Sequence, residues 1–391
     1  MAFDFPATPA LGQVFGNYIW DGEKWKLQGG QALGAVRYDT PQILSAGQQA
    51  QARDNIRIAK KNYIINGAMM ISQENEAAAA GNNNYFPVDM FIATFSYGGL
   101  CNAQQYPTIT PAGSPSRLRV TVITADTSMG AGEYYQVLHM IEGLRMVDLC
   151  CGTAAAKTVT LRFGLKAPAG TYSVAFRNYA SNRSYVAECV IAAGEANTDV
   201  VRTITVPLDQ TGVWNTNNTT GLIISWALLV GSTYQTATLN TWTASNLSAS
   251  TNQSNFMSTV GNVFELFDVS LTEGSVAPPF QVPDYASELA LCQRYYKHIA
   301  PEGAGICSTA TMVYFGVRYG DMRAAPAVSA NGVMTITDIL TSTFTQSVAN
   351  VIISTSDANA GLIGLGNFSG LTPGKVYVIQ STNKIKLNAR L

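Results

Sequence analysis

Apolar and polar residues alternate along most of residues 62–283, and this alternation limits the fold more than any other feature of the chain. In TVTLRFGLKAPAGTYSVAFRN, residues 158–178, the side chains of Val159, Leu161 and Phe163 share one face, because successive side chains of a β-strand point to opposite faces. Alternation resumes after an Ala-Pro-Ala-Gly turn. Further alternating segments lie at 116–124, 134–141, 185–192, 200–207, 221–230 and 262–271. We therefore predict a mainly β chain built on an antiparallel β-sandwich, most simply a jelly roll.

A proline-rich segment ends this pattern, because proline lacks the amide donor that a central strand needs. Its prolines are Pro278, Pro279 and Pro283. In residues 286–298 the apolar positions have helical spacing, and they are Leu289, Cys292 and Tyr296. Alternation then returns from residue 299 onward. We assign the jelly-roll domain to residues 62–283, and a second, smaller β domain with a short leading helix to residues 284–391.

The N-terminal residues 1–34 contain a short β-hairpin. Tyr18–Trp20 and Trp25–Leu27 flank an Asp-Gly pair, which is typical of a tight hairpin turn. An isolated hairpin is only marginally stable in water, so its tryptophans need a surface to pack against. We therefore expect Trp20 and Trp25 to attach the chain to a partner or to a larger body.

Residues 35–61 are predicted to form a helical neck. Ser45 and Gln48 have the spacing of a capping box. The apolar stripe of this segment is too sparse to stabilise a solitary helix. Two interpretations stay open, a solvated linker helix and a neck that packs against copies of itself.

The composition excludes some classes of partner. Charged residues make up 13% of the chain and the formal net charge is −1, so no basic surface for nucleic acid is expected. The longest apolar stretch, residues 221–231, is too short to cross a membrane. Residues 1–30 lack the pattern of a signal peptide, and the six cysteines form no CxxC pair. We expect reduced, mostly buried cysteines and synthesis in a cytoplasm.

No catalytic apparatus stands out in the sequence. The two histidines, His139 and His298, fall in different predicted domains, and no metal-binding or phosphate-binding motif occurs. Glycoside hydrolysis needs only two carboxylates, so it stays open, although no spacing singles out a pair. The available carboxylates are those of Asp89, Asp126, Glu133 and Glu142. We predict no catalytic residue, no metal site and no cofactor, and expect the chain not to be an enzyme.

Sugar binding is the chemistry that the predicted loops favour. Aromatic rings pack on the C–H faces of sugars, and amides and guanidinium groups bind sugar hydroxyls. Three predicted loops combine these groups, among them the Ser-, Thr- and Asn-rich segment 232–257, which we expect to be long and exposed. The glycan-binding candidates are Tyr179, Arg183, Trp214, the amide-rich position around Thr216 (Asn215 to Asn218), Tyr234 and Trp242. The alternative is that Trp214 and Trp242 simply close the ends of the sandwich.

Two stretches resemble the opening of a domain that is common in phage tail fibres and related appendages. They are NYIINGAMMISQ, residues 62–73, and YFPVDMF, residues 85–91. That opening has an Asn-x-x-x-Asn-Gly run, then a Gln, then an acidic residue before an Arg-Trp-like pair. The matching residues are Asn62, Asn66, Gly67, Gln73 and Asp89. Met90 and Phe91 stand in place of Arg-Trp, and Glu74 stands in place of the Arg that usually follows the Gln.

The segment after the predicted sandwich resembles the ending of the same domain. A strand leads through a Gly-Ser pair and prolines to a Glu-Leu-x-x-Cys-Gln-Arg-Tyr-Tyr run. The matching residues are Glu288, Leu289, Cys292, Gln293, Arg294, Tyr295 and Tyr296. We interpret this run as an interdomain joint rather than an active site. Leu289, Cys292 and Tyr296 are expected to pack between the domains, with Glu288 and Arg294 as an interface pair.

The resemblance is to virion appendages of the tail-fibre or head-fibre type that carry a carbohydrate-binding-like jelly roll. It implies a homotrimer that attaches by its N-terminus to other virion structural proteins and binds host cell-surface polysaccharide. It also implies a location in the virion after synthesis in the bacterial cytoplasm. Two alternatives stay open: a structural decoration or collar protein without a ligand, and a polysaccharide depolymerase.

Overall fold

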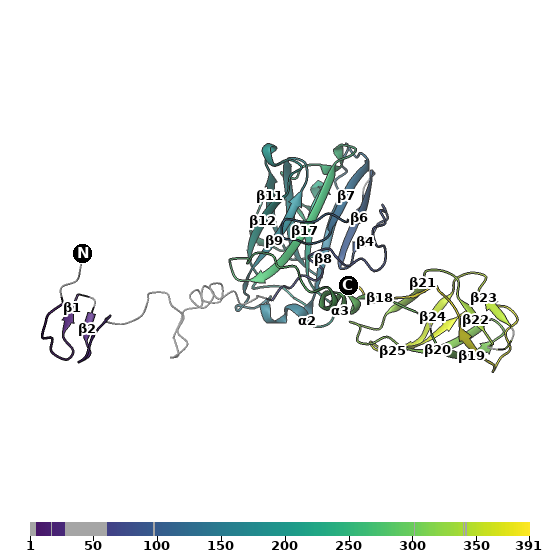
Figure 1. Cartoon of the computed structure of the whole chain (residues 1–391). Coiled ribbons are helices and arrows are strands. Elements are labelled where there is room, and N and C mark those ends of the chain that lie inside the picture. The colour runs from purple at the N-terminus through teal and green to yellow at the C-terminus, as the bar shows by residue number, and fades with distance from the viewer. Residues whose placement is uncertain are drawn as a thin grey trace. The chain divides into compact units, whose positions relative to one another are not determined.

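A computed structural model of the protein describes residues 5–16, 18–27, 61–96, 98–300, 302–338, 340 and 342–391 (Figure 1). The chain divides into two compact units, residues 1–59 and residues 60–391. Nearly all of the predicted helical neck, including Ser45 and Gln48, lies outside the described residues.

The N-terminal unit contains a small antiparallel sheet with the order β1 (Val14–Phe15), β2 (Tyr18–Trp20), β3 (Trp25–Leu27). The Asp21 carboxylate fixes the turn between β2 and β3 by accepting hydrogen bonds from the backbone amides of Glu23 and Lys24, at 3.0 and 2.8 Å. Trp25 stacks on Phe5 with ring centres 5.1 Å apart and lies 5.6 Å from Trp20. The predicted hairpin therefore gains a third strand and an aromatic cluster of its own, and Trp25 belongs to that cluster.

The second unit contains a sandwich of two antiparallel sheets. In its described residues, the larger sheet has the order β15-β11-β10-β13-β8-β5-β4, and the smaller sheet has the order β12-β9-β17-β7-β6 (Figure 1). The strands are β4 (Tyr85–Val88), β5 (Phe91–Ser96), β6 (Leu100–Tyr106), β7 (Arg117–Thr124), β8 (Tyr134–Glu142), β9 (Thr158–Lys166), β10 (Gly170–Asn178), β11 (Ser184–Ile191), β12 (Val200–Pro207), β13 (Thr220–Val230), β15 (Trp242–Thr243) and β17 (Val263–Glu273). The mainly β, antiparallel sandwich predicted from the alternation is confirmed.

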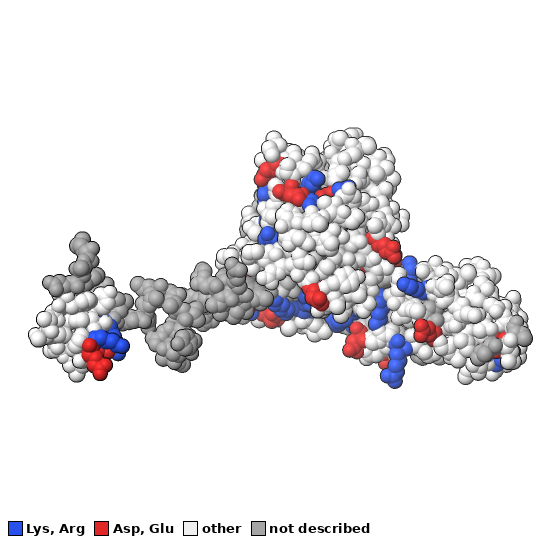
Figure 2. Space-filling view, in the orientation of Figure 1, with Lys and Arg blue, Asp and Glu red and all other residues white. Residues whose placement is uncertain are grey.

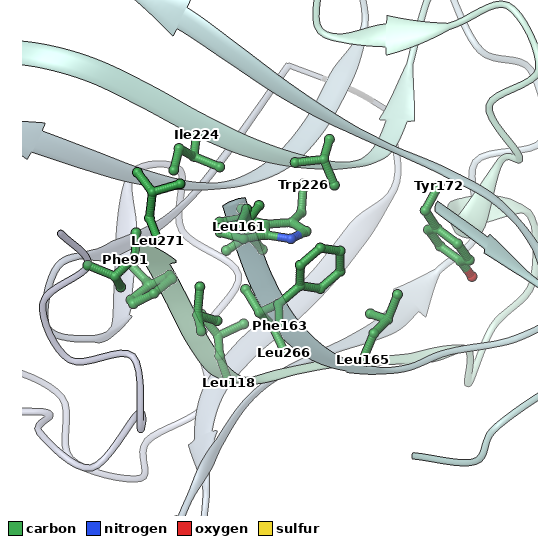
Figure 3. Close-up of a cluster of buried hydrophobic side chains, with 14 of the residues drawn as sticks. Phe91, Leu118, Leu161, Phe163, Leu165, Tyr172, Ile224, Trp226, Leu266 and Leu271 are labelled. Atoms are coloured by element: carbon green, nitrogen blue, oxygen red, sulfur yellow. The ribbon is translucent and has the colours of Figure 1, made fainter. Parts of the chain in front are cut away.

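The inner faces of the two sheets form one apolar core (Figure 3). Trp226 from the larger sheet packs edge to face on Phe163 from the smaller sheet, with ring centres 5.9 Å apart. Leu161, Leu266 and their neighbours on the same face are fully buried. Each such side chain contributes about 1.5–3 kcal/mol when it leaves water. The alternation in the sequence therefore marks the inner face of each strand.

The segment 232–257 is not the exposed loop that its composition suggests. It forms η3 (Ser232–Tyr234), the short parallel strands β14 (Gln235–Thr236) and β16 (Ala249–Ser250), strand β15, and η4 (Phe256–Ser258). Ser250 donates its backbone amide to the Ser173 hydroxyl at 2.9 Å, and Gln136 donates to the Ser248 hydroxyl at 3.1 Å. Each of these two hydrogen bonds joins the segment to a strand of the larger sheet. The segment therefore covers part of that sheet and is itself partly buried.

Short helices complete the sandwich and lead into a second β domain. They are α2 (Gly143–Met146), η1 (Val147–Leu149), η2 (Ala193–Glu195) and α3 (Tyr285–Gln293). In the described residues, the domain has one small sheet, β18-β27-β21, and one large sheet, β23-β22-β26-β19-β20-β25-β24. Its strands are β18 (Tyr296–Ile299), β19 (Ala304–Thr309), β20 (Met312–Arg318), β21 (Ala327–Ala330), β22 (Thr335–Thr337), β23 (Thr343–Thr345), β24 (Val351–Ser356), β25 (Ala360–Leu365), β26 (Val376–Ile379) and β27 (Ile385–Asn388). A separate apolar cluster, residues 307–389, forms its core.

We expect Gly164→Ala to destabilise the sandwich by about 1–3 kcal/mol, the usual range for overpacking a core. A Cβ at Gly164 would lie 2.1 Å from the ring of Phe267, which rests on the glycine across the strand pair. The measurement is thermal unfolding of the full chain. The matched control is Gly132→Ala, because a Cβ there meets no atom within 4 Å. Equal melting temperatures for the two variants would contradict close packing at Gly164.

Candidate functional site

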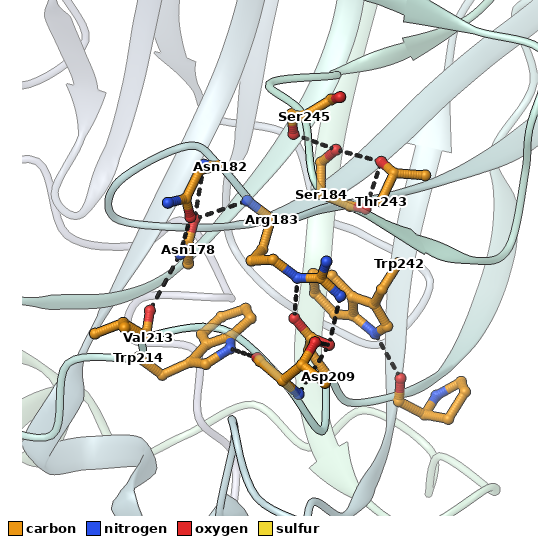
Figure 4. A network of polar contacts seen from close by, with 12 residues as sticks. Asn178, Asn182, Arg183, Ser184, Asp209, Val213, Trp214, Trp242, Thr243 and Ser245 are labelled. Carbon is orange, nitrogen blue, oxygen red and sulfur yellow. Dashed lines mark hydrogen bonds and ion pairs between the residues drawn. The ribbon is translucent and has the colours of Figure 1, made fainter.

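Four of the predicted glycan-binding residues lie at one end of the larger sheet. Tyr179 and Arg183 belong to the turn between β10 and β11, Trp214 to the loop between β12 and β13, and Trp242 to β15. We call this region, residues 178–184, 207–214 and 242–243, the Trp corner (Figure 4).

The turn between β10 and β11 is held by the side chain of Asn178. Its Oδ1 accepts hydrogen bonds from the backbone amides of Asn182 and Arg183, at 3.1 Å each (Figure 4). Its Nδ2 donates to Asn182 Oδ1 at 2.7 Å and to the Val213 carbonyl at 3.1 Å. Asn178 is fully buried, so these bonds replace those that its amide would make to water. The hydrogen bonds of the Asn178 side chain therefore fix the conformation of the turn.

Arg183 forms a two-point ion pair with Asp209. Its Nε and Nη2 atoms lie 2.6 and 2.8 Å from the two carboxylate oxygens (Figure 4). The same carboxylate accepts hydrogen bonds from the amide and the hydroxyl of Thr211, at 3.2 and 3.0 Å. Burial alone would raise the pKa of Asp209, but these bonds outweigh burial and place the pKa below its usual value. The ion pair therefore fixes the direction of the Arg183 side chain.

The two tryptophans pack edge to face, with ring centres 5.4 Å apart and planes at 90° (Figure 4). Trp214 is only 8% exposed, and its Nε1 donates to the Thr211 carbonyl at 3.0 Å. Trp242 pairs with Tyr185 across the strands and donates from Nε1 to the Pro207 carbonyl at 2.8 Å. Both tryptophans therefore close this end of the sandwich, and the ring of Trp214 is largely withheld from any ligand.

A mixed polar and apolar surface remains on the outside of the Trp corner. The side chain of Tyr179 is 63% exposed and that of Val213 is 79% exposed. Among the described residues, no hydrogen bond uses Arg183 Nη1 or Asn182 Nδ2. An exposed aromatic ring beside a guanidinium and an amide can hold the apolar face of a sugar and donate to its hydroxyls. The internal bonds fix these donors before any ligand binds.

The structure does not bring the other two predicted positions into this surface. Tyr234 follows the C-terminal end of β13 and packs edge to face on Tyr134, whereas the Trp corner lies at the opposite end of β13. Thr216 is exposed, but its neighbour Asn217 bonds within the loop to Thr219. Asn218 turns away and bonds to Arg323 of the C-terminal domain.

Sequence reasoning missed the residues that position the Trp corner. Asp209, the partner of Arg183, lies 26 residues further along the chain. Asn178 has no motif around it and acts through the turn that follows it. A weak signal was present, because the Asp-x-Thr-Gly run at 209–212 has the composition of a side-chain-stabilised turn.

The carboxylates that could support catalysis each bond to a different neighbouring residue. Asp89 bonds to Gln73, Asp126 to the amide of Ser128, and Glu133 to the amide of Gly130. His139 is buried on β8, where burial lowers its pKa to about 3, so the ring is neutral near pH 7. Nothing in the described residues groups three or more His, Cys, Asp and Glu side chains as a metal site would. Across the same described part of the chain, every helix is too short or too polar to span a bilayer.

The predicted joint is formed by α3 and the residues that follow it, at one end of the sandwich. Asp284 caps α3 by accepting from the amide of Ser287 at 2.9 Å. Glu288 is buried and accepts from the amide of Asn66, and burial raises the pKa of Glu288. Cys292 is fully buried in the sandwich core, and Leu289 packs against that core.

The predicted pair between Glu288 and Arg294 is wrong. Arg294 instead binds Glu142 at the end of β8, with its Nη1 2.7 Å from the carboxylate. The Tyr295 hydroxyl donates to the same carboxylate at 2.6 Å. Glu288 instead accepts a hydrogen bond from the backbone amide of Asn66. The joint therefore has two separate carboxylate contacts.

Tyr296 lies on strand β18 and not on the helix, because α3 ends at Gln293. The ring of Tyr296 is buried. The guanidinium of Arg390 lies 3.8 Å from the centre of this ring and 3.9 Å from the centre of the Phe86 ring. Arg390 also pairs with Glu74, the position where the resembling family has Arg. This stack joins the C-terminal domain to the sandwich.

No family model matches the sequence, and no curated protein sequence matches it either. Among solved structures, the chain is similar to the enzymatically active domain of tailspike protein 4 of bacteriophage CBA120, with 12% identity and a TM-score of 0.28. That match covers 55% of this chain and 21% of that one, so the chain spans about a fifth of the tailspike protein's length.

The chain is also similar to carbohydrate-binding modules. A family 11 module from Clostridium thermocellum has 9% identity and a TM-score of 0.27, and the match covers 51% of this chain and 98% of that one. A family 4 module has 14% identity and a TM-score of 0.26, with 54% and 99% covered. Each of these matches covers about half of this chain.

We expect Asp209→Asn to destabilise the sandwich by about 2–3 kcal/mol, because it leaves the partly buried Arg183 without its counter-charge. The measurement is chemical denaturation at neutral pH. Glu195→Gln is the matched control, because it breaks a more exposed ion pair, in which the side chains of Glu195 and Arg202 are 38% and 27% exposed. A loss no larger than that of the control would contradict the structural role of the pair.

The same ion pair predicts a pH dependence. A carboxyl whose pKa is lowered by folding stabilises the protein above its unfolded pKa of about 4, and the contribution is lost as the pH falls through the folded pKa. We expect the stability difference between the protein and Asp209→Asn to shrink on acidification below about pH 4. Denaturation curves at a series of pH values measure it, and a constant difference would contradict the lowered pKa.

We expect Glu142→Gln to destabilise the joint by about 1–2 kcal/mol, because Tyr295 keeps an acceptor while the partly exposed Arg294 loses its counter-charge. Hydrogen exchange of the α3 amides measures the effect locally. Glu273→Gln, in an exposed pair with Lys157, is the control. Unchanged protection of α3 in Glu142→Gln would show that the pair does not stabilise the joint.

Proposed function

We propose that the chain is a virion appendage of a tailed phage or phage-like particle, which attaches through its N-terminal unit and binds host cell-surface glycan. The observation that carries the proposal is the outer surface of the Trp corner. There Tyr179 is 63% exposed in the same turn as Asn182 and Arg183, which have unused donors. The resemblance of residues 62–73 and 288–296 to fibre domains supports the particle and the N-terminal attachment.

A surface of this size supports weak binding by one copy. A single aromatic contact contributes about 0.5–1.5 kcal/mol beyond its buried area. We therefore propose that the chain acts as a homotrimer, in which several weak sites engage one surface together and avidity replaces affinity. The scarcity of charged side chains over the sandwich suits contacts between copies (Figure 2).

Attachment is assigned to the small N-terminal sheet. Because Trp25 is taken up by the aromatic cluster around Phe5 and Phe15, Trp20 is the tryptophan that we propose for contact with other virion proteins. We further propose that binding is not accompanied by catalysis. The buried carboxylates of Asp89 and Glu142 support this, because each is bound by neighbouring side chains.

We expect Tyr179→Ala to weaken binding to intact host cells about tenfold, which corresponds to about 1.4 kcal/mol, without a change in melting temperature. Labelled full-length protein is titrated onto intact cells and onto cells stripped of surface polysaccharide. Tyr285→Ala is the matched control, because Tyr285 is 56% exposed on α3 and is not one of the residues of the Trp corner.

This titration and a lawn-clearing assay together distinguish the three functions. Binding that disappears on stripping and falls in Tyr179→Ala alone supports the proposal. A folded protein that binds neither kind of cell indicates a structural decoration protein. Clearing of a host lawn by the purified protein indicates a depolymerase.

A further inference from the structure

A compact group of polar side chains covers the outer face of the smaller sheet at its β12 edge. Cross-strand pairing places them in two rows on adjacent strands. The first row is Ser270, Arg162 and Thr203, and the second row is Thr272, Thr160 and Thr205. We call these six side chains the polar grid. It holds one positive charge and no carboxylate.

Three atoms of the polar grid are buried and have no hydrogen-bond partner among the described residues. They are Arg162 Nη1, Ser270 Oγ and Thr272 Oγ1. Ser270 is 6% exposed and Thr272 is 2% exposed. Most buried polar groups of proteins have a hydrogen-bond partner, so three unpaired groups together on one face are unusual. By contrast, Thr160 bonds to the Gly274 carbonyl at 2.7 Å.

Arg162 also differs from its neighbours on this face, because no carboxylate of the described residues is in direct contact with it. Two other arginines on the same face, Arg117 and Arg119, both bind the carboxylate of Glu265. The negative charge of Asp268 acts on Arg162 without direct contact, and its carboxylate accepts hydrogen bonds from the hydroxyls of Thr110 and Ser114. Among the described residues, Arg162 makes no ion pair.

The exposure of the polar grid increases toward the β12 edge of the sheet. Thr203 and Thr205 are exposed on the edge strand β12, Arg162 is half-buried on the middle strand β9, and the two unpaired hydroxyls lie deeper on β17. A small group entering from the β12 edge would therefore meet Arg162 first and then the hydroxyls.

We propose that the polar grid binds an oxyanion, namely a carboxylate, sulfate or phosphate group. The three unpaired groups are all able to donate, and an oxyanion has enough lone pairs to accept from all of them at once. The anion would also neutralise Arg162. The site shares no residue with the Trp corner, and the inference stands whether or not the Trp corner binds glycan.

The test is calorimetric titration of the full chain with sodium sulfate and, separately, with sodium glucuronate, at constant ionic strength. We expect saturable one-to-one binding of at least one probe, and at least tenfold weaker binding to Arg162→Gln. Arg318→Gln, which removes an exposed arginine from the C-terminal domain, is the matched control and should bind as the unaltered chain does. Preference for glucuronate identifies an acidic sugar as the source of the anion, and preference for sulfate identifies a free inorganic ion.

A second variant keeps the test decisive if Arg162→Gln fails to fold. Ser270→Ala removes a hydroxyl that has no partner, so its melting temperature without anion should equal or exceed that of the unaltered chain. Its sulfate or glucuronate binding should be several-fold weaker. The proposal is overturned if neither probe binds, if Arg162→Gln and Arg318→Gln lose binding equally, or if Ser270→Ala is less stable without anion, which would show that ordered water already satisfies the site.

Discussion

The contact of Trp226 with rings from both sheets is the interaction on which the sandwich depends. Trp226 lies on β13 at the middle of the larger sheet and packs on Phe163 of the smaller sheet and on Phe91 of its own sheet. Each sheet has one apolar face, and neither face is stable in water alone. Once the two faces meet, every loop that carries polar chemistry is confined to the sheet ends or outer faces. The packing of the two inner faces against each other therefore fixes where the Trp corner, the joint and the polar grid lie.

The alternation of residues was sufficient to predict the sandwich, because a period of two reports directly which side chains face inward. It could not predict where the outer faces are covered. The segment 232–257 has a loop composition, yet Ser248 and Ser250 bond to the larger sheet and are buried. Small hydroxyl residues serve equally well in an exposed loop and in a strap that satisfies a sheet, so composition alone does not separate these outcomes.

The candidate site was predictable only in part, for a topological reason. Arg183, Trp214 and Trp242 were identified as aromatic and polar loop residues, and the strand order brings them to one end of the larger sheet. Tyr234 has the same local signature, but β13 runs the length of the sheet and carries it to the opposite end. Whether loops meet is decided by strand order, and the sequence patterns gave the strands without their order. The pairing of Arg294 with Glu142 rather than Glu288 has the same cause.

The segment 63–73 is bound by residues far along the chain. The amide of Tyr63 donates to the Leu271 carbonyl at 3.0 Å, and Gln73 donates to the Tyr296 carbonyl at 2.7 Å, 223 residues away. During synthesis at about 5–20 residues per second, this segment waits on the order of 10–45 s for its partners to leave the ribosome. Its apolar residues, including the fully buried Met69, are exposed for that time. We therefore expect the nascent chain to be prone to aggregation until residues 271–296 have been made.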